Sequence, residues 1–335
     1  MPSTAAPLPA RLPPVLTAAD LTDAGLHPER SRRADLRRVG QGLYRQTACD
    51  PGSWADVGLA DPSHGHDRDL LDAVLRRRPT AVLSHETAAH LHGIPTPSRP
   101  WRPPDDVGLP RDAAAPVHLT LPRGSRRIRR PGLVDHRRRL DPAHVTTVHG
   151  LRVTTLERTW LDLCALGFPW RLEDLVAAGD HCVKRPWTPQ GRLPPLSTPD
   201  ALARTLREVG RFSGIRTARA ALDLVRVGAD SPPETRLRLA LVDAGLPEPE
   251  LQAPIHPADP RSPEADLAYR SLRLCLQYDG AGHRTPDQQT RDARRERYAA
   301  AHGWDTWRAT VHDLREGFAS LVGEVRRRHA AAGTL

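Results

Sequence analysis

The sequence predicts an α+β N-terminal region, followed by an α/β C-terminal domain with the element order αβββαβα. The 335 residues are enough for two or three compact units, at roughly 100–200 residues per unit. Short helical and strand-like segments alternate up to residue 154, and a proline-rich stretch at 183–200 separates them from a second set that begins at Ser231. The expected parts are 1–60, 61–182, a linker with two helices at 183–228, and 229–335.

The charge balance favours a polyanion, chiefly nucleic acid, as partner. The net charge is +9, and Lys184 is the only lysine, so arginine carries the positive charge. Guanidinium groups bind phosphate with paired hydrogen bonds, but biased arginine codon usage would give the same composition. Four tyrosines and three phenylalanines offer few platforms for stacking unpaired bases, which favours double-stranded DNA over RNA.

The sequence predicts a cytoplasmic protein without a membrane span. It has no run of about 18 apolar residues, and its first residues lack the charged-then-apolar order of a signal peptide. The cysteines are scattered and form no C-x-x-C pair, so neither a disulfide framework nor a structural zinc site is expected: Cys49, Cys164, Cys182 and Cys275.

Residues 17–45 predict a short helix ending at Gly25, a second short helix opened by Pro28, and a two-stranded ribbon with its turn at Gly40 and Gly42. Two small helices before a ribbon are typical of a winged helix-turn-helix. A small helical cap with a solvated basic face would show the same pattern. The candidate DNA-binding residues are Arg30, Arg32 and Arg33.

A helix with Ser84 as its N-cap is predicted over 84–94. Its His85 and His90 are five residues apart, whereas zinc-protease histidines are four apart on one helix face, so that motif is excluded.

Three further segments predict strands of a small antiparallel sheet: 117–121, 131–136 and 144–154. Between the first two lies an arginine run, which is either a phosphate-binding surface or a hairpin edge that its charge protects from pairing. Its candidate DNA-binding residues are Arg126, Arg127, Arg129 and Arg130.

After Ser231 the pattern predicts a helix at 233–244, strands near 252–256, 265–269 and 272–278, a helix from Pro286 to Gly303, a strand at 304–309 and a last helix. Asp266 and Asp279 would lie on neighbouring strands, and carboxylates that converge there can hold a hard divalent cation such as Mg²⁺. A capping role for Glu234 and a simple turn at Asp279 are the structural alternatives.

Two resemblances cover much of the chain. The stretches SPPETRLRLALVDAGL, EADLAY, LCLQYDGAGH and RDARRERYAAAHGWDTWRAT, spanning about 231–325, resemble the DUF559 type of short domain. That family belongs to the PD-(D/E)xK, restriction-endonuclease-like superfamily, close to the very-short-patch repair endonucleases. SHETAAHLHGI and GLRVTTLERTWLDLCALG are similar to the AbiEi-type antitoxin-like proteins that often precede such a domain.

The first resemblance implies an active site. Asp266 matches the superfamily's metal-binding aspartate and Glu234 its helical glutamate, while Gln277 and Asp279 fall on the (D/E) and K positions. His283 matches a histidine that transfers protons in the repair enzymes. The lysine is thus replaced by Asp279, and Gln277 brings an amide oxygen without charge, which should weaken metal binding.

The implied function is a Mg²⁺- or Mn²⁺-dependent endonuclease, or a degenerate descendant of one, acting on DNA. Backbone phosphates would be held by Arg291, Arg294 and Arg295, although a solvated helix face is an equal alternative. The competing hypothesis is a non-enzymatic, antitoxin-type transcriptional regulator that binds operator DNA through residues 17–45. A toxin partner or a homodimer stays open.

Overall fold

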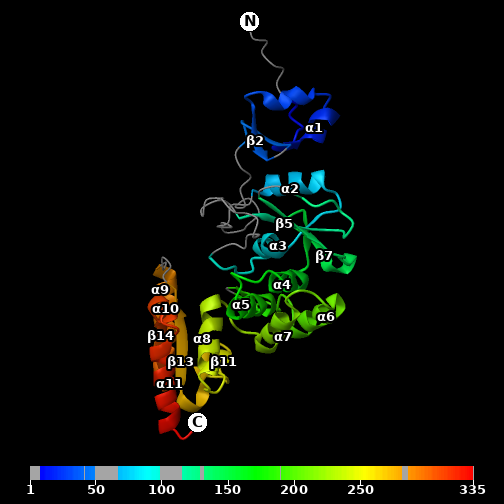
Figure 1. The fold of residues 1–335 in the computed structure, drawn as a ribbon. Helices are drawn as coiled ribbons and strands as arrows, with labels where there is room; N and C mark the ends of the chain where they lie inside the picture. Colours follow the sequence, from blue (N-terminus) through cyan, green and yellow to red (C-terminus); the bar gives the residue numbers. More distant parts are fainter. Residues whose placement is uncertain are drawn as a thin grey trace. The chain divides into compact units, whose positions relative to one another are not determined.

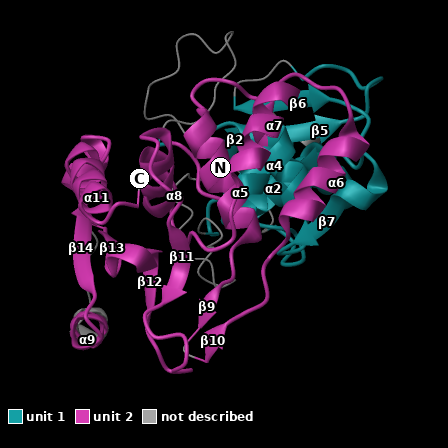
Figure 2. Ribbon diagram, turned by 90° about the horizontal axis from the view of Figure 1, so that it is seen from below, with its two compact units in different colours: residues 1–93, 98–162 teal, residues 94–97, 163–335 magenta. Residues whose placement is uncertain are grey.

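The structure is a computed structural model, and it describes residues 8–40, 42–49, 67–98, 115–128, 132–188, 190–280 and 286–334. The chain divides into two compact units, one of residues 1–93 with 98–162 and one of residues 94–97 with 163–335 (Figure 2). Both units combine helices and sheet, so the expected mixed fold class is confirmed. Among the described residues, no helix has both the length and the apolar character needed to cross a membrane.

The first unit begins with a three-stranded antiparallel sheet of order β1-β3-β2. Its elements are β1 (Val15–Thr17), α1 (Ala18–Asp23), the 3-10 turn η1 (Pro28–Arg32), β2 (Leu36–Gly40) and β3 (Leu43–Gln46). The ribbon is confirmed, but the second expected helix is only a 3-10 turn, because the backbone is already extended at Arg33 and an Arg30–Asp35 ion pair closes the corner before β2. The described residues there contain no second α-helix.

A five-stranded sheet of order β6-β5-β4-β8-β7 follows. The elements are α2 (Arg68–Arg77), β4 (Val82–Leu83), α3 (His85–Leu91), β5 (Val117–Leu121), β6 (Leu133–Arg137), the 3-10 turn η3 (Pro142–His144), β7 (Val145–Val148), β8 (Leu151–Thr154) and α4 (Leu156–Cys164). The antiparallel expectation is confirmed within 144–154, where β7 pairs with β8, but the sheet as a whole is mixed, because β5 pairs with β6, and β4 with β8, in parallel. A parallel pair requires a crossover between its strands, and on the β5 side of this connection buried Ile128 donates its N–H to Asp135 of β6.

One hydrophobic core joins the two sheets of the first unit. Leu71 and Val74 of α2 share a cluster with Val15 of the small sheet and with Leu119 and Val153 of the larger one. The expected separate part at residues 1–60 therefore shares its core with the chain that follows.

The second unit starts with three helices and a short ribbon: α5 (Leu172–Val183), β9 (Trp187–Thr188), β10 (Gly191–Arg192), α6 (Pro199–Val209) and α7 (Ile215–Leu224). The ribbon lies in the stretch expected to be a linker. Arg192 anchors it, since its guanidinium lies 2.9 Å from Asp230 Oδ2 and 2.8 Å from Glu264 Oε2.

The C-terminal elements follow the expected order αβββαβα, with one extra short helix (Figure 1). They are α8 (Pro232–Asp243), β11 (Glu250–Pro254), β12 (Glu264–Tyr269), the 3-10 turn η4 (Arg270–Leu272), β13 (Leu274–Asp279), α9 (Pro286–Ala301), β14 (Asp305–Thr310), α10 (Val311–Arg315) and α11 (Ala319–Ala331). The sheet order is β11-β12-β13-β14, antiparallel except for the parallel β13–β14 pair. The helices α8 and α11 pack on one face of this sheet, and α9 packs on the other.

Candidate functional site

Asp266 is a charged residue within the otherwise apolar core of β12. The antiparallel register that pairs Leu267 with Leu276 places Asp266 opposite Gln277 on β13. The Tyr278 N–H donates to Asp266 Oδ2 over 3.2 Å, and the guanidinium of Arg295 lies 3.6 Å from Oδ1. These contacts fix the carboxylate in position with Arg295 beside it.

Glu234 approaches Asp266 from the first turn of α8 and is buried. Its carboxylate accepts hydrogen bonds from the Asp230 N–H at 2.9 Å and from the Ser231 hydroxyl at 2.6 Å, so it does help to cap the helix. The pKa of Glu234 is raised to about 8, mainly because the side chain is buried and also because Asp266 places a negative charge nearby. Capping alone does not explain a glutamate placed against a second carboxylate.

A cavity of about 720 Å³ opens beside Asp266. The ribbon β9–β10, the loop before β12 and α9 all contribute to its lining. Its charged lining residues are Arg192, Asp230, Arg261, Glu264, Asp266 and Arg295. The cavity therefore presents one carboxylate of the pair together with guanidinium groups that suit phosphate.

Gln277 is buried beside this pair, with 6% of its surface exposed. Among the described residues its Nε2 has no hydrogen-bond partner. A buried amide N–H without an acceptor is costly in a resting core, so packing alone does not explain this residue.

Asp279 lies at the end of β13 and is turned toward β14, where its Oδ2 is 3.8 Å from Arg308 Nη1. Arg308 also pairs with Glu296 of α9. Within the described parts of the chain, Glu234, Asp266 and Asp279 do not form a set whose ligand atoms lie within 4.8 Å of one another. The structure thus places Asp266 opposite Gln277 and near enough to Glu234 for its charge to act there, while Asp279 lies beside Arg308. His283 lies outside the described residues.

The predicted DNA-binding arginines differ in exposure. Arg30 is buried against Asp35, so it stabilises the fold and offers no surface for DNA. The exposed ones are Arg32, Arg33, Arg126, Arg127 and Arg294. Arg129 and Arg130 lie outside the described residues, as does the side chain of Arg291, while Arg295 contacts the site through Asp266.

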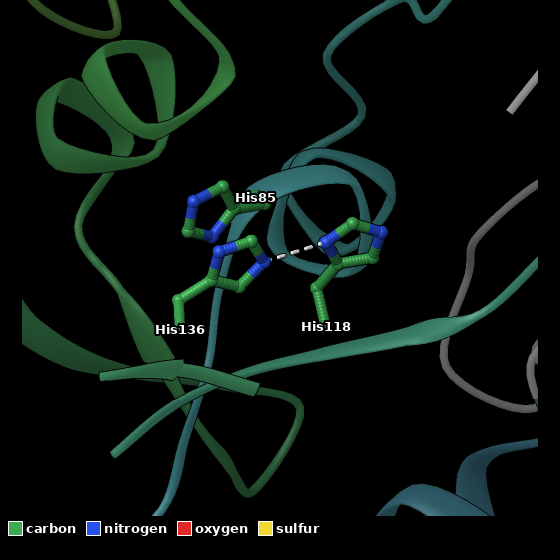
Figure 3. Close-up of side chains that lie close together, drawn as sticks. All are labelled: His85, His118 and His136. Atoms are coloured by element: carbon green, nitrogen blue, oxygen red, sulfur yellow. Dashed lines mark hydrogen bonds between the residues drawn. The ribbon is translucent and has the colours of Figure 1, made fainter. Parts of the chain in front are cut away.

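A second polar cluster, in the first unit, escaped the sequence analysis. His85 begins α3, His118 lies on β5 and His136 on β6, and their rings stack beside one another (Figure 3). Burial and the neighbouring histidines hold the pKa of His85 well below its ordinary range, while burial, aided by Arg138, lowers that of His136 to about 3. No spacing in the sequence marks this cluster, because it depends on the parallel pairing of β5 with β6.

Comparison with known proteins finds no family model that matches the chain. Two proteins of Mycobacterium tuberculosis, the uncharacterized protein MT2308 of strain CDC 1551 / Oshkosh and the uncharacterized protein Rv2248 of strain ATCC 25618 / H37Rv, are each 33% identical to it over 115 residues. The match takes in 34% of this chain and 42% of each relative, so the chain spans less than half of their length. Neither name describes an activity.

Proposed function

We propose that residues 229–335 form a restriction-endonuclease-like domain that hydrolyses phosphodiester bonds in double-stranded DNA with Mg²⁺ or Mn²⁺. The observation that carries the proposal is Asp266, a carboxylate in an apolar strand that borders the cavity and faces buried Glu234. The element order αβββαβα and the mixed four-stranded sheet support it.

The residues present fit a hard cation in part. Asp266 and Glu234 would hold the ion, and the amide oxygen of Gln277 would be a neutral third ligand. When bound, such an ion activates water and offsets charge on the scissile phosphate. Asp279 would contribute only after leaving Arg308, which accounts for a weakened site in the absence of a lysine.

The remaining roles fall to side chains around the cavity. Arg295 and Arg261 would bind phosphates next to the scissile bond, because both line the cavity that contains Asp266. His283 is the proposed proton carrier for the leaving group. Arg295 also offsets part of the negative charge of Asp266 before DNA binds.

The first unit is proposed to hold DNA in a cytoplasmic protein. With Arg30 buried and the second helix reduced to a 3-10 turn, a winged-helix-like function rests on the ribbon β2–β3 and on exposed Arg32 and Arg33. Arg126 and Arg127 provide a second exposed basic pair. Each phosphate contact that is lost should flatten the salt dependence of binding by about 0.9 in log–log slope.

Nicking of supercoiled plasmid DNA by the full chain tests the enzyme proposal. We expect nicking that requires Mg²⁺ or Mn²⁺, is abolished in Asp266→Asn, and persists in Glu264→Gln. The control residue lies on the same strand and lines the same cavity but pairs with Arg192. If the full chain shows no metal-dependent nicking while it still binds DNA, the non-enzymatic regulator takes the place of the nuclease.

A further inference from the structure

We propose that His85, His118 and His136 form a binding site for a transition-metal ion of the zinc type within the first unit. This site is independent of the carboxylates in the second unit. Each histidine offers one ring nitrogen, and these three nitrogens lie within 4.8 Å of one another. They come from one helix and two strands of a single compact unit, so the fold already brings the ligands together.

The spacing of the rings is close to what zinc requires. His118 Nδ1 lies 3.0 Å from His136 Nε2, and the two face each other in Figure 3. With Zn–N bonds of about 2.0–2.1 Å, two nitrogens on a tetrahedral ion lie roughly 3.3 Å apart. The ring of His85 stacks on His136 with 3.4 Å between centroids, so a modest rotation of His85 would complete a three-nitrogen set.

Polar groups lie behind two of the rings. The buried carboxylate of Glu86 lies 3.9 Å from His118 Nε2, on the side of the ring away from Nδ1, the atom that faces His136. His85 Nδ1 lies 2.9 Å from the Ser84 hydroxyl, which itself accepts a hydrogen bond from Thr120. Such outer partners orient histidine ligands in metal proteins.

His85 carries two further signs of a functional site. Among the described residues its Nε2 is buried without a hydrogen-bond partner. Its backbone has a φ of +51°, in the left-handed region that residues other than glycine seldom adopt. Strain of this kind persists where the surrounding structure fixes a side chain for a purpose.

The ligand type selects the ion. Imidazole nitrogens suit zinc, copper and nickel, whereas Mg²⁺ requires oxygen ligands. Three neutral side chains leave one position of a tetrahedral ion for water or an anion, which is the arrangement of zinc sites that bind a substrate. The nearby charges are arginines Arg138 and Arg158 and carboxylates Glu86 and Asp162.

Metal titration of the tag-free full chain, stripped with chelator, tests the site. We expect calorimetry to give one Zn²⁺ per chain, and Co²⁺ to give the visible absorption of a tetrahedral nitrogen-bound ion. His136→Ala should abolish both signals, and Glu86→Gln should weaken Zn²⁺ binding by about 10–100-fold. His312→Ala, which removes a surface histidine with 75% side-chain exposure, and Asp266→Asn should change neither signal.

Two results would overturn the site. One is a full chain that binds no Zn²⁺ stoichiometrically and gives no tetrahedral Co²⁺ spectrum. The other is binding that His136→Ala leaves unchanged. If circular dichroism shows that His136→Ala is unfolded, the Co²⁺ spectrum of the unaltered chain decides, because nitrogen ligation in a tetrahedral field is visible there without any variant.

Discussion

Two buried residues with ionisable side chains, Glu234 and Arg238, lie one helical turn apart on α8, and they differ in the charges that surround them. Arg238 is 1% exposed, and its guanidinium is matched by Asp180 at 3.0 Å, Glu248 at 2.9 Å and the carbonyl oxygen of Leu224 at 2.8 Å. Glu234 faces the like charge of Asp266 instead. A fold tolerates a buried charge that opposite charges match, and loss of one partner is costly. A buried carboxylate beside a like charge instead indicates a place for a proton or a cation.

The largest expected effect follows from cutting the chain between α5 and α8. A fragment of residues 229–335 loses Asp180 and the Leu224 carbonyl, two partners of Arg238, together with helix α5, which packs against α8. We expect this fragment to show no cooperative unfolding in urea, and a fragment of residues 163–335 to show one. Cooperative unfolding of the shorter fragment would show that folding does not need the ion pair between Arg238 and Asp180.

Asp180→Ala removes the same partner inside the full chain. Breaking a buried ion pair costs about 3–5 kcal/mol, because the remaining charge stays buried. Arg236→Ala is the matched control, since it breaks a pair with Asp174 at 2.6 Å whose arginine is 37% exposed, and it should cost about 1 kcal/mol or less. Equal losses of unfolding free energy in the two variants would show that the buried ion pair matters no more than the partly exposed one.

The raised pKa of Glu234 predicts a pH dependence of stability. The pKa of Glu234 is about 8 in the folded chain, against an ordinary value of 4.5, so between these values the folded state holds more protons than the unfolded state. The free energy of unfolding contributed by Glu234 therefore falls as the pH rises from about 4.5 to about 8. In Asp266→Asn the fall should end at a lower pH, as followed by urea unfolding in chelator. An identical decline in both chains would show that Asp266 does not raise the pKa of Glu234.

The smallest effect concerns Gln277. Gln277→Glu adds a third carboxylate beside Glu234 and Asp266, so without metal it should destabilise the fold by at least about 1 kcal/mol. Mn²⁺ should raise the melting temperature of this variant more than that of the parent chain, because affinity grows with ligand charge. A smaller Mn²⁺ shift in the variant would place Gln277 away from the cation.

Local patterns were enough to predict the C-terminal elements. Alternation in LCLQYD assigned Leu276 and Gln277 to opposite faces, and the helix starting after Ser231 was marked by its prolines. The same patterns placed Asp266 inside a strand. The turn of Asp279 toward Arg308 could not be foreseen, because it depends on which strand pairs with β13 on its other side.

Other features depended on contacts between distant segments. The parallel pairing of β5 with β6 leaves no local trace in a sequence, and the antiparallel expectation failed there. The histidine cluster was missed for the same reason, since that pairing brings His136 to the other two histidines, His85 and His118. Arg30 is buried and pairs with Asp35, and composition alone cannot distinguish such an arginine from a solvated one.

The central claim is that buried Glu234 and Asp266 lie beside each other in order to hold a divalent cation. Calorimetric titration of Mn²⁺ into the zinc-free full chain, beside Asp266→Asn and the control Glu264→Gln, tests it most directly. We predict one bound ion in the parent and in Glu264→Gln, and no binding in Asp266→Asn while its circular dichroism spectrum is unchanged. No heat of binding in the parent, or equal binding in all three chains, would contradict the claim.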